Sequence, residues 1–253
     1  SSPNQQLEIT RNFRLPNTTS TSGTYGVIYK GTSPFIHDFN YGNNGTVTTS
    51  GYNTFIGINA GNLTMGSTAT QAYQASYNTA LGSYSLRSNT TGYNNTALGY
   101  QSLYSNTIGY YNTAIGYNAL YSNTTGYYNT AVGLNSGRYI ADGSTTNQTS
   151  NNSVYLGYNT KALANGDTNE TVIGYNATGA GSNTTVIGNS SVTNTYFGSS
   201  TGASKLWASA LNLNGLTASK VVFTDASKNL TSTGIGTSSQ FIKGDGSLDS
   251  STY

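Results

Sequence analysis

The side chains that could do acid, base or nucleophilic chemistry are few in this chain. His37 is its single histidine, so a Ser-His-Asp triad or a His-based metal site has one candidate at most. Asp38 follows it directly, and no third partner is visible, so we expect a structural role for this pair. Residues 198–202 fit the G-x-S-x-G pattern of a nucleophilic serine, but that pattern requires a following helix and none is predicted there. We therefore expect no catalytic residue, no metal site and no cofactor.

Carboxylates offer one enzymatic alternative, because two of them suffice to cleave a glycosidic bond. The chain has 8 Asp and Glu residues, and Asp167 and Glu170 are the closest pair outside the carboxyl-terminal segment. A polysaccharide depolymerase is the function that this pair would serve. Solvation of a loop or binding of a cation explains the pair more simply, and the Asp-x-x-Glu spacing is too loose to define a calcium loop. We expect a protein that is not an enzyme.

Tyrosine is the most informative residue type, with 22 copies in 253 residues. A tyrosine ring offers apolar area and a polar tip at low entropic cost, so exposed rings could form platforms for the faces of sugars. Packing of the rings against one another would alternatively serve stability alone. Two stretches that interrupt the repeat, residues 61–76 and 138–152, are other candidate contact points. The candidate receptor-binding residues recur at steps of 17 and are Tyr93, Tyr100, Tyr104, Tyr110, Tyr117, Tyr121 and Tyr127.

The charge balance and composition exclude several partner classes. Ten Lys and Arg are spread over the whole length and nearly balanced by Asp and Glu, so we expect no nucleic-acid partner. No apolar run approaches the length of a membrane span, so we expect no membrane insertion. The chain contains no Cys, which excludes disulfides and thiolate metal sites.

An internal repeat organises the chain. The phrase Asn-Thr-Ala-aliphatic-Gly recurs at a constant step of 17 residues, and insertions break the step on either side. Its glycines are Gly82, Gly99, Gly116 and Gly133. Weaker copies flank these four and end at Gly57, Gly157, Gly174, Gly188 and Gly198.

Each unit predicts strands and turns rather than helices. Thr-Ala-Leu-Gly-Tyr and Ser-Leu-Tyr favour β structure, and clusters of Ser, Asn, Thr and Gly between them favour turns. The recurring glycines indicate backbone with positive φ or close approach of neighbouring coils. We predict an all-β fold, a parallel β-roll or β-helix with 17-residue coils. Residues 1–50 would form a small β collar, residues 51–198 the solenoid, and residues 199–253 a linker or stalk whose β segments are separated by Ser, Thr and Gly.

The thinness of such a coil predicts self-association. Burying the apolar set of one coil, Ala114, Ile115, Ala119 and Leu120, does not offset the entropy lost in ordering 17 residues. The threonine and the aliphatic residue share one face of each strand, and the alanine lies on the other. One face can pack within the chain and one against a partner, so we expect a homo-oligomer with its axis along the stack. The threonines of successive repeats would form a ladder, which suggests ice binding as another possible function. Bulky tyrosines nearby make it a weaker alternative.

The repeat resembles the head repeats of YadA-type trimeric autotransporter adhesins and, more closely, those of phage tail fibres and mosaic adhesive trimeric fibres. Units such as residues 112–128, NTAIGYNALYSNTTGYY, carry this resemblance, together with residues 26–37 and the segments 224–230 and 241–248. It implies a parallel homotrimer and a role in surface attachment, outside the cell or on a virion tail. The expected function is a structural and adhesive fibre segment that binds a cell-surface glycan or protein receptor. A depolymerase tail spike and a purely structural shaft are the alternatives.

Overall fold

The computed structural model describes residues 26–192 and four short strands near the carboxyl end, at residues 222–224, 230–232, 241–242 and 248–249. The expectations for residues 1–25 of the collar, the repeat copy and serine motif at 195–202, and a strand at 205–208 lie outside the described residues. The chain divides into two compact units, residues 1–193 and 194–253, each taken here by itself.

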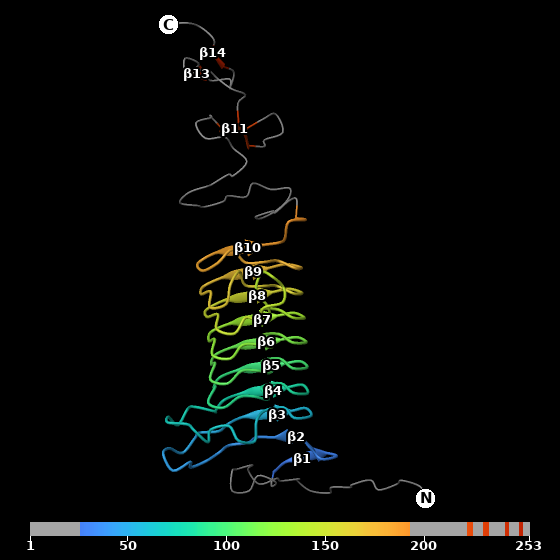
Figure 1. Cartoon of the computed structure of the whole chain (residues 1–253), viewed down its shortest axis with the longest axis vertical. Helices are drawn as coiled ribbons and strands as arrows, with labels where there is room; N and C mark the ends of the chain where they lie inside the picture. The colour runs from blue at the N-terminus through green and yellow to red at the C-terminus, as the bar shows by residue number, and fades with distance from the viewer. Residues whose placement is uncertain (1–25, 193–221, 225–229, 233–240, 243–247, 250–253) are drawn as a thin grey trace, which may run out of the picture. The chain divides into compact units, whose positions relative to one another are not determined.

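The first unit is a β-solenoid of about six turns, which confirms the predicted stacked coil. Its ten strands form one sheet in chain order, parallel from β3 to β10 (Figure 1). The described residues contain no helix. The strands are β1 (Ile28–Lys30), β2 (Ser33–His37), β3 (Thr54–Ile56), β4 (Thr79–Leu81), β5 (Thr96–Leu98), β6 (Thr113–Ile115), β7 (Thr130–Val132), β8 (Val154–Leu156), β9 (Thr171–Ile173) and β10 (Thr185–Ile187).

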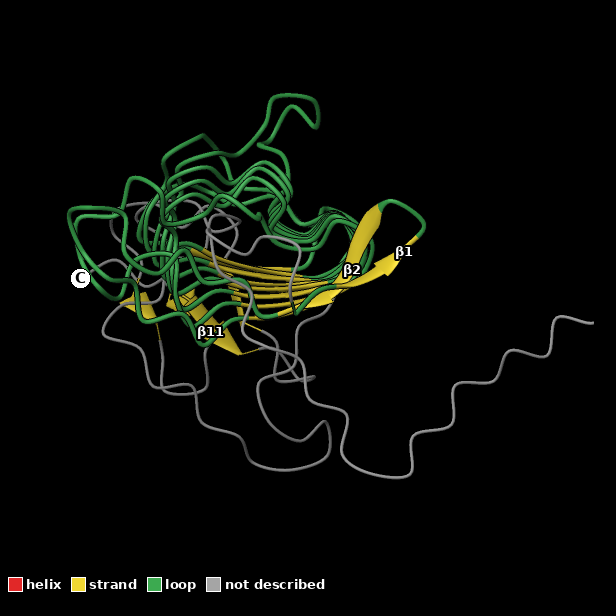
Figure 2. Cartoon of the chain, turned by 90° about the horizontal axis from the view of Figure 1, so that it is seen from below, coloured by secondary structure: helices red, strands yellow, loops and turns green. Residues whose placement is uncertain are grey.

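Each coil contributes a single short strand, and like residues stack on like. In the pairing of β5 with β6, Thr96 lies beside Thr113 and Ala97 beside Ala114. Figure 2 shows the strands nearly superposed along one side of the stack, with turns forming the rest of each coil. The second predicted stretch, Ser-Leu-Tyr, is a turn rather than a strand: Leu103 has a φ of 50° while its N–H still bonds Ala119 of the next coil at 3.0 Å. A left-handed leucine costs backbone energy, and its complete burial offsets that cost.

The repeated glycines close the turn after each strand. Gly116 has a φ of 136°, and a Cβ placed there would lie 2.5 Å from the carbonyl oxygen of Gly133 in the next coil. Both reasons predicted for these glycines, positive φ and close approach of coils, therefore hold at this position.

The core consists of an alanine column and a leucine column inside the coils. Ala97, Ala114 and Leu103 are fully buried. Ile115 was expected in this core but lies on the outer face of β6, because its neighbour Ala114 points inward and side chains alternate along a strand. In the coil of β3, Phe55 takes the place of the buried alanine and Gly61 takes the place of the buried leucine. The two changes go together because a Cβ at Gly61 would lie 2.7 Å from the Phe55 ring.

A ladder of buried asparagines runs beside the alanine column. The amide nitrogen of Asn112 donates to Asn95 Oδ1 at 3.2 Å and to the carbonyl of Gly126 at 2.8 Å. Asn112 Oδ1 in turn accepts from the backbone N–H of Asn129 at 3.0 Å. The same bonds join Asn78 to Asn95, so side chains hydrogen-bond one coil to the next where the backbone enters the strand.

Both ends of the described chain carry antiparallel pairs. β1 and β2 form a hairpin, and β2 pairs antiparallel with β3. Near the carboxyl end, β11 (Val222–Thr224) pairs with β12 (Leu230–Ser232), and β13 (Phe241–Ile242) with β14 (Leu248–Asp249). Separated β segments were predicted within residues 199–253; the described strands there pair with one another, which was not predicted.

Candidate functional site

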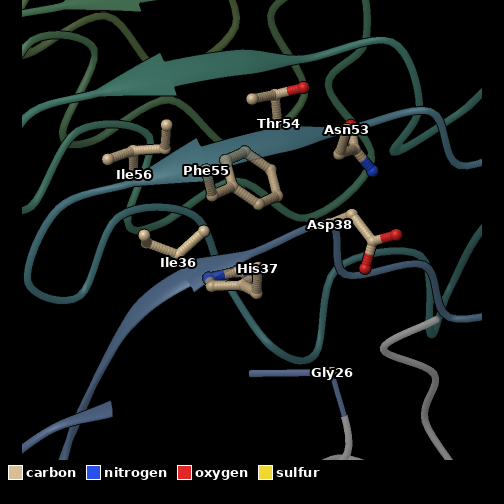
Figure 3. Close-up of a pocket in the computed structure, with 8 residues that line it drawn as sticks. All are labelled: Gly26, Ile36, His37, Asp38, Asn53, Thr54, Phe55 and Ile56. Atoms are coloured by element: carbon tan, nitrogen blue, oxygen red, sulfur yellow. The ribbon is translucent and has the colours of Figure 1, made fainter. Parts of the chain in front are cut away.

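His37 lies at the amino-terminal end of the stack, beside a hollow of about 260 Å³ (Figure 3). Its Nε2 lies 2.8 Å from the carbonyl oxygen of Ala60, and its Nδ1 accepts the N–H of Phe39 at 3.3 Å. Donation from Nε2 and acceptance at Nδ1 fit one neutral tautomer, so both ring nitrogens have partners. Burial lowers the pKa of His37 below its ordinary 6.5, with the bond to Ala60 and the charge of Asp38 opposing. Figure 3 shows Asp38 directed away from the His37 ring, so the two do not form an acid-base pair.

The two carboxylates considered for glycoside cleavage differ in exposure, since Glu170 is buried and Asp167 is half-buried. Glu170 is completely buried, and its Oε1 accepts the N–H of Gly181 at 2.9 Å. Burial raises the pKa of this carboxyl group, and the charge of Asp167 adds to the effect. Asp167 accepts hydrogen bonds from Ala164 at 2.7 Å and Ser182 at 3.0 Å. Since Glu170 has no exposed surface to offer a polymer, its position does not favour the depolymerase alternative.

Other classes of site were sought in the described residues. They contain no group of three or more His, Asp and Glu side chains that could hold a metal ion. Nor does this part of the chain include a helix of the length and hydropathy needed to cross a bilayer.

The tyrosine ladders predicted from the 17-residue step are present. Tyr93, Tyr110 and Tyr127 form a continuous stack, with ring centroids 4.9 Å apart and planes within 2° of parallel. Tyr111 and Tyr128 form a second stack beside the first, with centroids 5.0 Å apart. The centroid separation matches the spacing of the strands. Carbon atoms in contact lie only about 3.5–4.0 Å apart, so rings whose centroids are farther apart are offset sideways and cover one another only in part.

The two stacks pack edge to face, with interplanar angles of 76° to 80° between them. Tyr73, from the insertion at residues 61–76, meets Tyr93 in the same way at 4.8 Å. Among the described residues no protein group hydrogen-bonds the hydroxyls of these tyrosines. Burial and neighbouring tyrosines raise the pKa of Tyr93 and Tyr110, so their phenols stay neutral. We call this surface the tyrosine patch; it comprises Tyr73, Tyr77, Tyr93, Tyr110, Tyr111, Tyr127 and Tyr128.

The remaining candidate tyrosines lie in two other columns, which the structure does not join to the patch. Tyr104 stacks on Tyr121, and the guanidinium of Arg138 lies 4.6 Å from the Tyr121 ring centroid, covering that end of the pair. Tyr100 stacks on Tyr117 at 5.2 Å, and both are exposed. Sequence analysis missed the continuation of this column, although each member follows a repeat glycine; the further members are Leu134, Tyr158 and Tyr175.

The outward side chains of β3–β10 form a second candidate surface, which we call the sheet face. These eight strands contain no charged residue. Their first residues are threonine in every strand except β8, where the first residue is Val154, and their third residues are aliphatic in all eight. Leu81, Leu98 and Ile187 are at least 40% exposed. Apolar side chains therefore line a flat, uncharged surface that extends over the length of the stack, as predicted from the alternation within each strand.

No family model, no curated protein and no solved structure matches the chain.

Proposed function

We propose that this chain is a structural and adhesive segment of a trimeric fibre on a cell surface or virion tail, with a cell-surface glycan or protein as its receptor. The observation that carries the proposal is the pair of long surfaces on one stack. An uncharged apolar sheet face is suited to self-association, and a tyrosine patch with free hydroxyls is suited to binding.

A second copy of the chain is the occupant that fits the sheet face best. Every rung repeats at the strand spacing, so the rungs of two copies can stay in register along the whole stack. The absence of charge from β3–β10 removes electrostatic repulsion between identical surfaces. We propose three copies, rather than two or more than three, because the repeats resemble those of trimeric fibres.

The tyrosine patch supports the adhesive half of the proposal. Tyr111 and Tyr128 are 46% and 51% exposed although they are aromatic. Rigid rings with neutral hydroxyls lose little entropy on binding and offer both apolar area and hydrogen bonds, which is the combination that sugars require.

A purely structural shaft is the second candidate, and one observation favours it. Each ring in a ladder turns much of its face to the next ring, and Arg138 covers the end of the Tyr104–Tyr121 pair. Stacked rings stabilise the coils whether or not they bind anything.

A glycan array separates the two candidates. We expect the wild-type chain to bind at least one class of cell-surface glycan, and Tyr93→Phe to weaken that binding about tenfold or more, because the ring stays in its stack while the hydroxyl is lost. Tyr158→Phe, which removes a hydroxyl outside the tyrosine patch, is the matched control and should bind as wild type.

An array on which the wild-type chain binds nothing would contradict carbohydrate adhesion by this segment. Binding that both variants retain in full would move the contact away from the hydroxyls of the tyrosine patch. Melting temperatures of the three proteins should agree, since each variant keeps its aromatic ring.

A further inference from the structure

One ring is missing from an otherwise regular column of the tyrosine patch. The residue before each ladder asparagine adopts a left-handed backbone, and in consecutive coils it is Tyr52, Tyr77, Asn94, Tyr111 and Tyr128, with φ between 53° and 61°. Tyr52 stacks on Tyr77 at 5.5 Å, and Tyr111 on Tyr128 at 5.0 Å. Asn94 therefore interrupts the column between two stacked pairs.

The interruption leaves an open hollow of about 390 Å³, a size within the usual range for ligand pockets. Tyr77 and Tyr111, which occupy the same position as Asn94 in the preceding and following coils, both line it. These two residues are two coils apart, which corresponds to about 9.6 Å at the strand spacing, so an inserted ring would lie one rung from each. Tyr93 and Tyr73, packed edge to face at 4.8 Å, complete the walls. The insertion at residues 61–76 and the tyrosine ladders, predicted as separate contact points, meet here.

The polar groups of the hollow are neutral. Asn94 lines it, and its side-chain amide hydrogen-bonds no other described residue, so two N–H donors and one acceptor of that side chain are free. Among the described residues, no charged side chain lines the hollow. In the neighbouring coils, Tyr77 and Tyr111 fill the equivalent position with a six-membered ring that ends in a hydroxyl. A ligand that replaces the missing side chain would therefore be a six-membered ring with polar groups at its edge.

We infer that this hollow binds one hexopyranose unit of a neutral glycan, held between Tyr77 and Tyr111. The apolar face of the sugar would lie against the rings, and its hydroxyls would meet the Asn94 amide and the tyrosine hydroxyls. This inference rests on the proposed adhesive function and narrows its receptor to a neutral carbohydrate. Quaternary ammonium groups also bind between aromatic rings, but nothing charged lines this hollow to favour a cation over a neutral ring.

The variant Asn94→Tyr tests the inference by filling the hollow with the residue that the column uses elsewhere. The backbone at Asn94, with a φ of 53°, matches that at Tyr111, so the variant should fold. Stacking of the new ring on its neighbours in the column should offset the backbone cost of a left-handed tyrosine and keep the melting temperature close to that of wild type. With neutral oligosaccharides of glucose, galactose and mannose as probes, we expect Asn94→Tyr to bind at least tenfold more weakly than wild type. Asn152→Tyr, which adds a tyrosine to the same column away from the hollow, is the matched control and should bind normally.

The outcomes distinguish this inference from the proposed function. Glycan binding that Asn94→Tyr leaves unchanged would overturn the hollow as the sugar site while the adhesive function stands. Failure of the wild-type chain to bind any glycan would overturn both the hollow as a sugar site and carbohydrate adhesion by this segment. Titration with tetramethylammonium tests the alternative of a cation site. If wild type binds that cation but no sugar, and Asn94→Tyr loses the binding, the hollow is a cation site and the hexopyranose is contradicted.

Discussion

Replacing Gly116 by Ala should destabilise the solenoid by about 4 kcal/mol or more, among the largest effects of a single substitution. The backbone φ of 136° is one that residues with a Cβ rarely adopt, which costs about 1–3 kcal/mol. The new methyl group would in addition lie 2.5 Å from the Gly133 carbonyl oxygen, in the next coil. Relief of that contact requires separation of two coils that are hydrogen-bonded on both sides of the glycine. Chemical unfolding followed by circular dichroism measures the loss.

Gly143→Ala is the matched control for this prediction. Gly143 also has a positive φ, 73°, but a Cβ there would meet nothing within 4 Å. We expect a loss of about 1–2 kcal/mol, the backbone term alone. Equal losses for the two variants would show that close approach of the coils is not what restricts position 116 to glycine.

Asn112→Leu is expected to cost about 3 kcal/mol or more, although leucine is apolar, similar in size and suited to a buried position. The substitution removes four side-chain hydrogen bonds, two donated to Asn95 and Gly126 and two accepted from Asn129. The backbone N–H of Asn129 loses its acceptor, and an unsatisfied buried N–H costs about 1–3 kcal/mol by itself.

The same replacement at an exposed asparagine is the comparison for Asn112. Asn43 accepts one hydrogen bond from Gly45 in solvent, so Asn43→Leu should cost less than about 1 kcal/mol. A melting temperature for Asn112→Leu close to that of Asn43→Leu would mean that the asparagine ladder contributes little to the stability of the stack.

The fold was predictable where one period governs backbone and side chains together. The step of 17 residues locates the strands β4–β7, and the Thr-Ala-aliphatic alternation places Ala97 and Leu98 on opposite faces of β5. Which of the two faces is the core was not predicted; the structure buries Ala97 and exposes Leu98. The glycine phase predicts the positive φ at Gly99 and Gly116. These features follow from local rules, because every coil meets the same neighbours above and below.

Other features depend on geometry between columns, which the period does not contain. Leu103 favours a strand by composition, yet stacking in register and burial hold it in a left-handed turn. The tyrosine ladders follow from the step, but the edge-to-face packing of Tyr110 against Tyr128 depends on the tilt of the rings. The hollow at Asn94 did have a sequence signal, since aligned units place that asparagine where neighbouring coils have tyrosine. Whether a missing ring leaves an open space depends on the residues around it. One of these, Tyr73, comes from an insertion, whose position the repeat does not predict.

The mass of the chain in solution tests the proposed trimer most directly. Light scattering at micromolar concentration should give three times the 26.5 kDa of one chain. Leu98→Glu places charge on the sheet face and should yield monomers, whereas Ile108→Glu, at an exposed isoleucine in a turn outside β3–β10, should leave the trimer intact. A wild-type mass of 26.5 kDa would contradict the proposed trimer, and a Leu98→Glu chain that still forms trimers would contradict an interface on the sheet face.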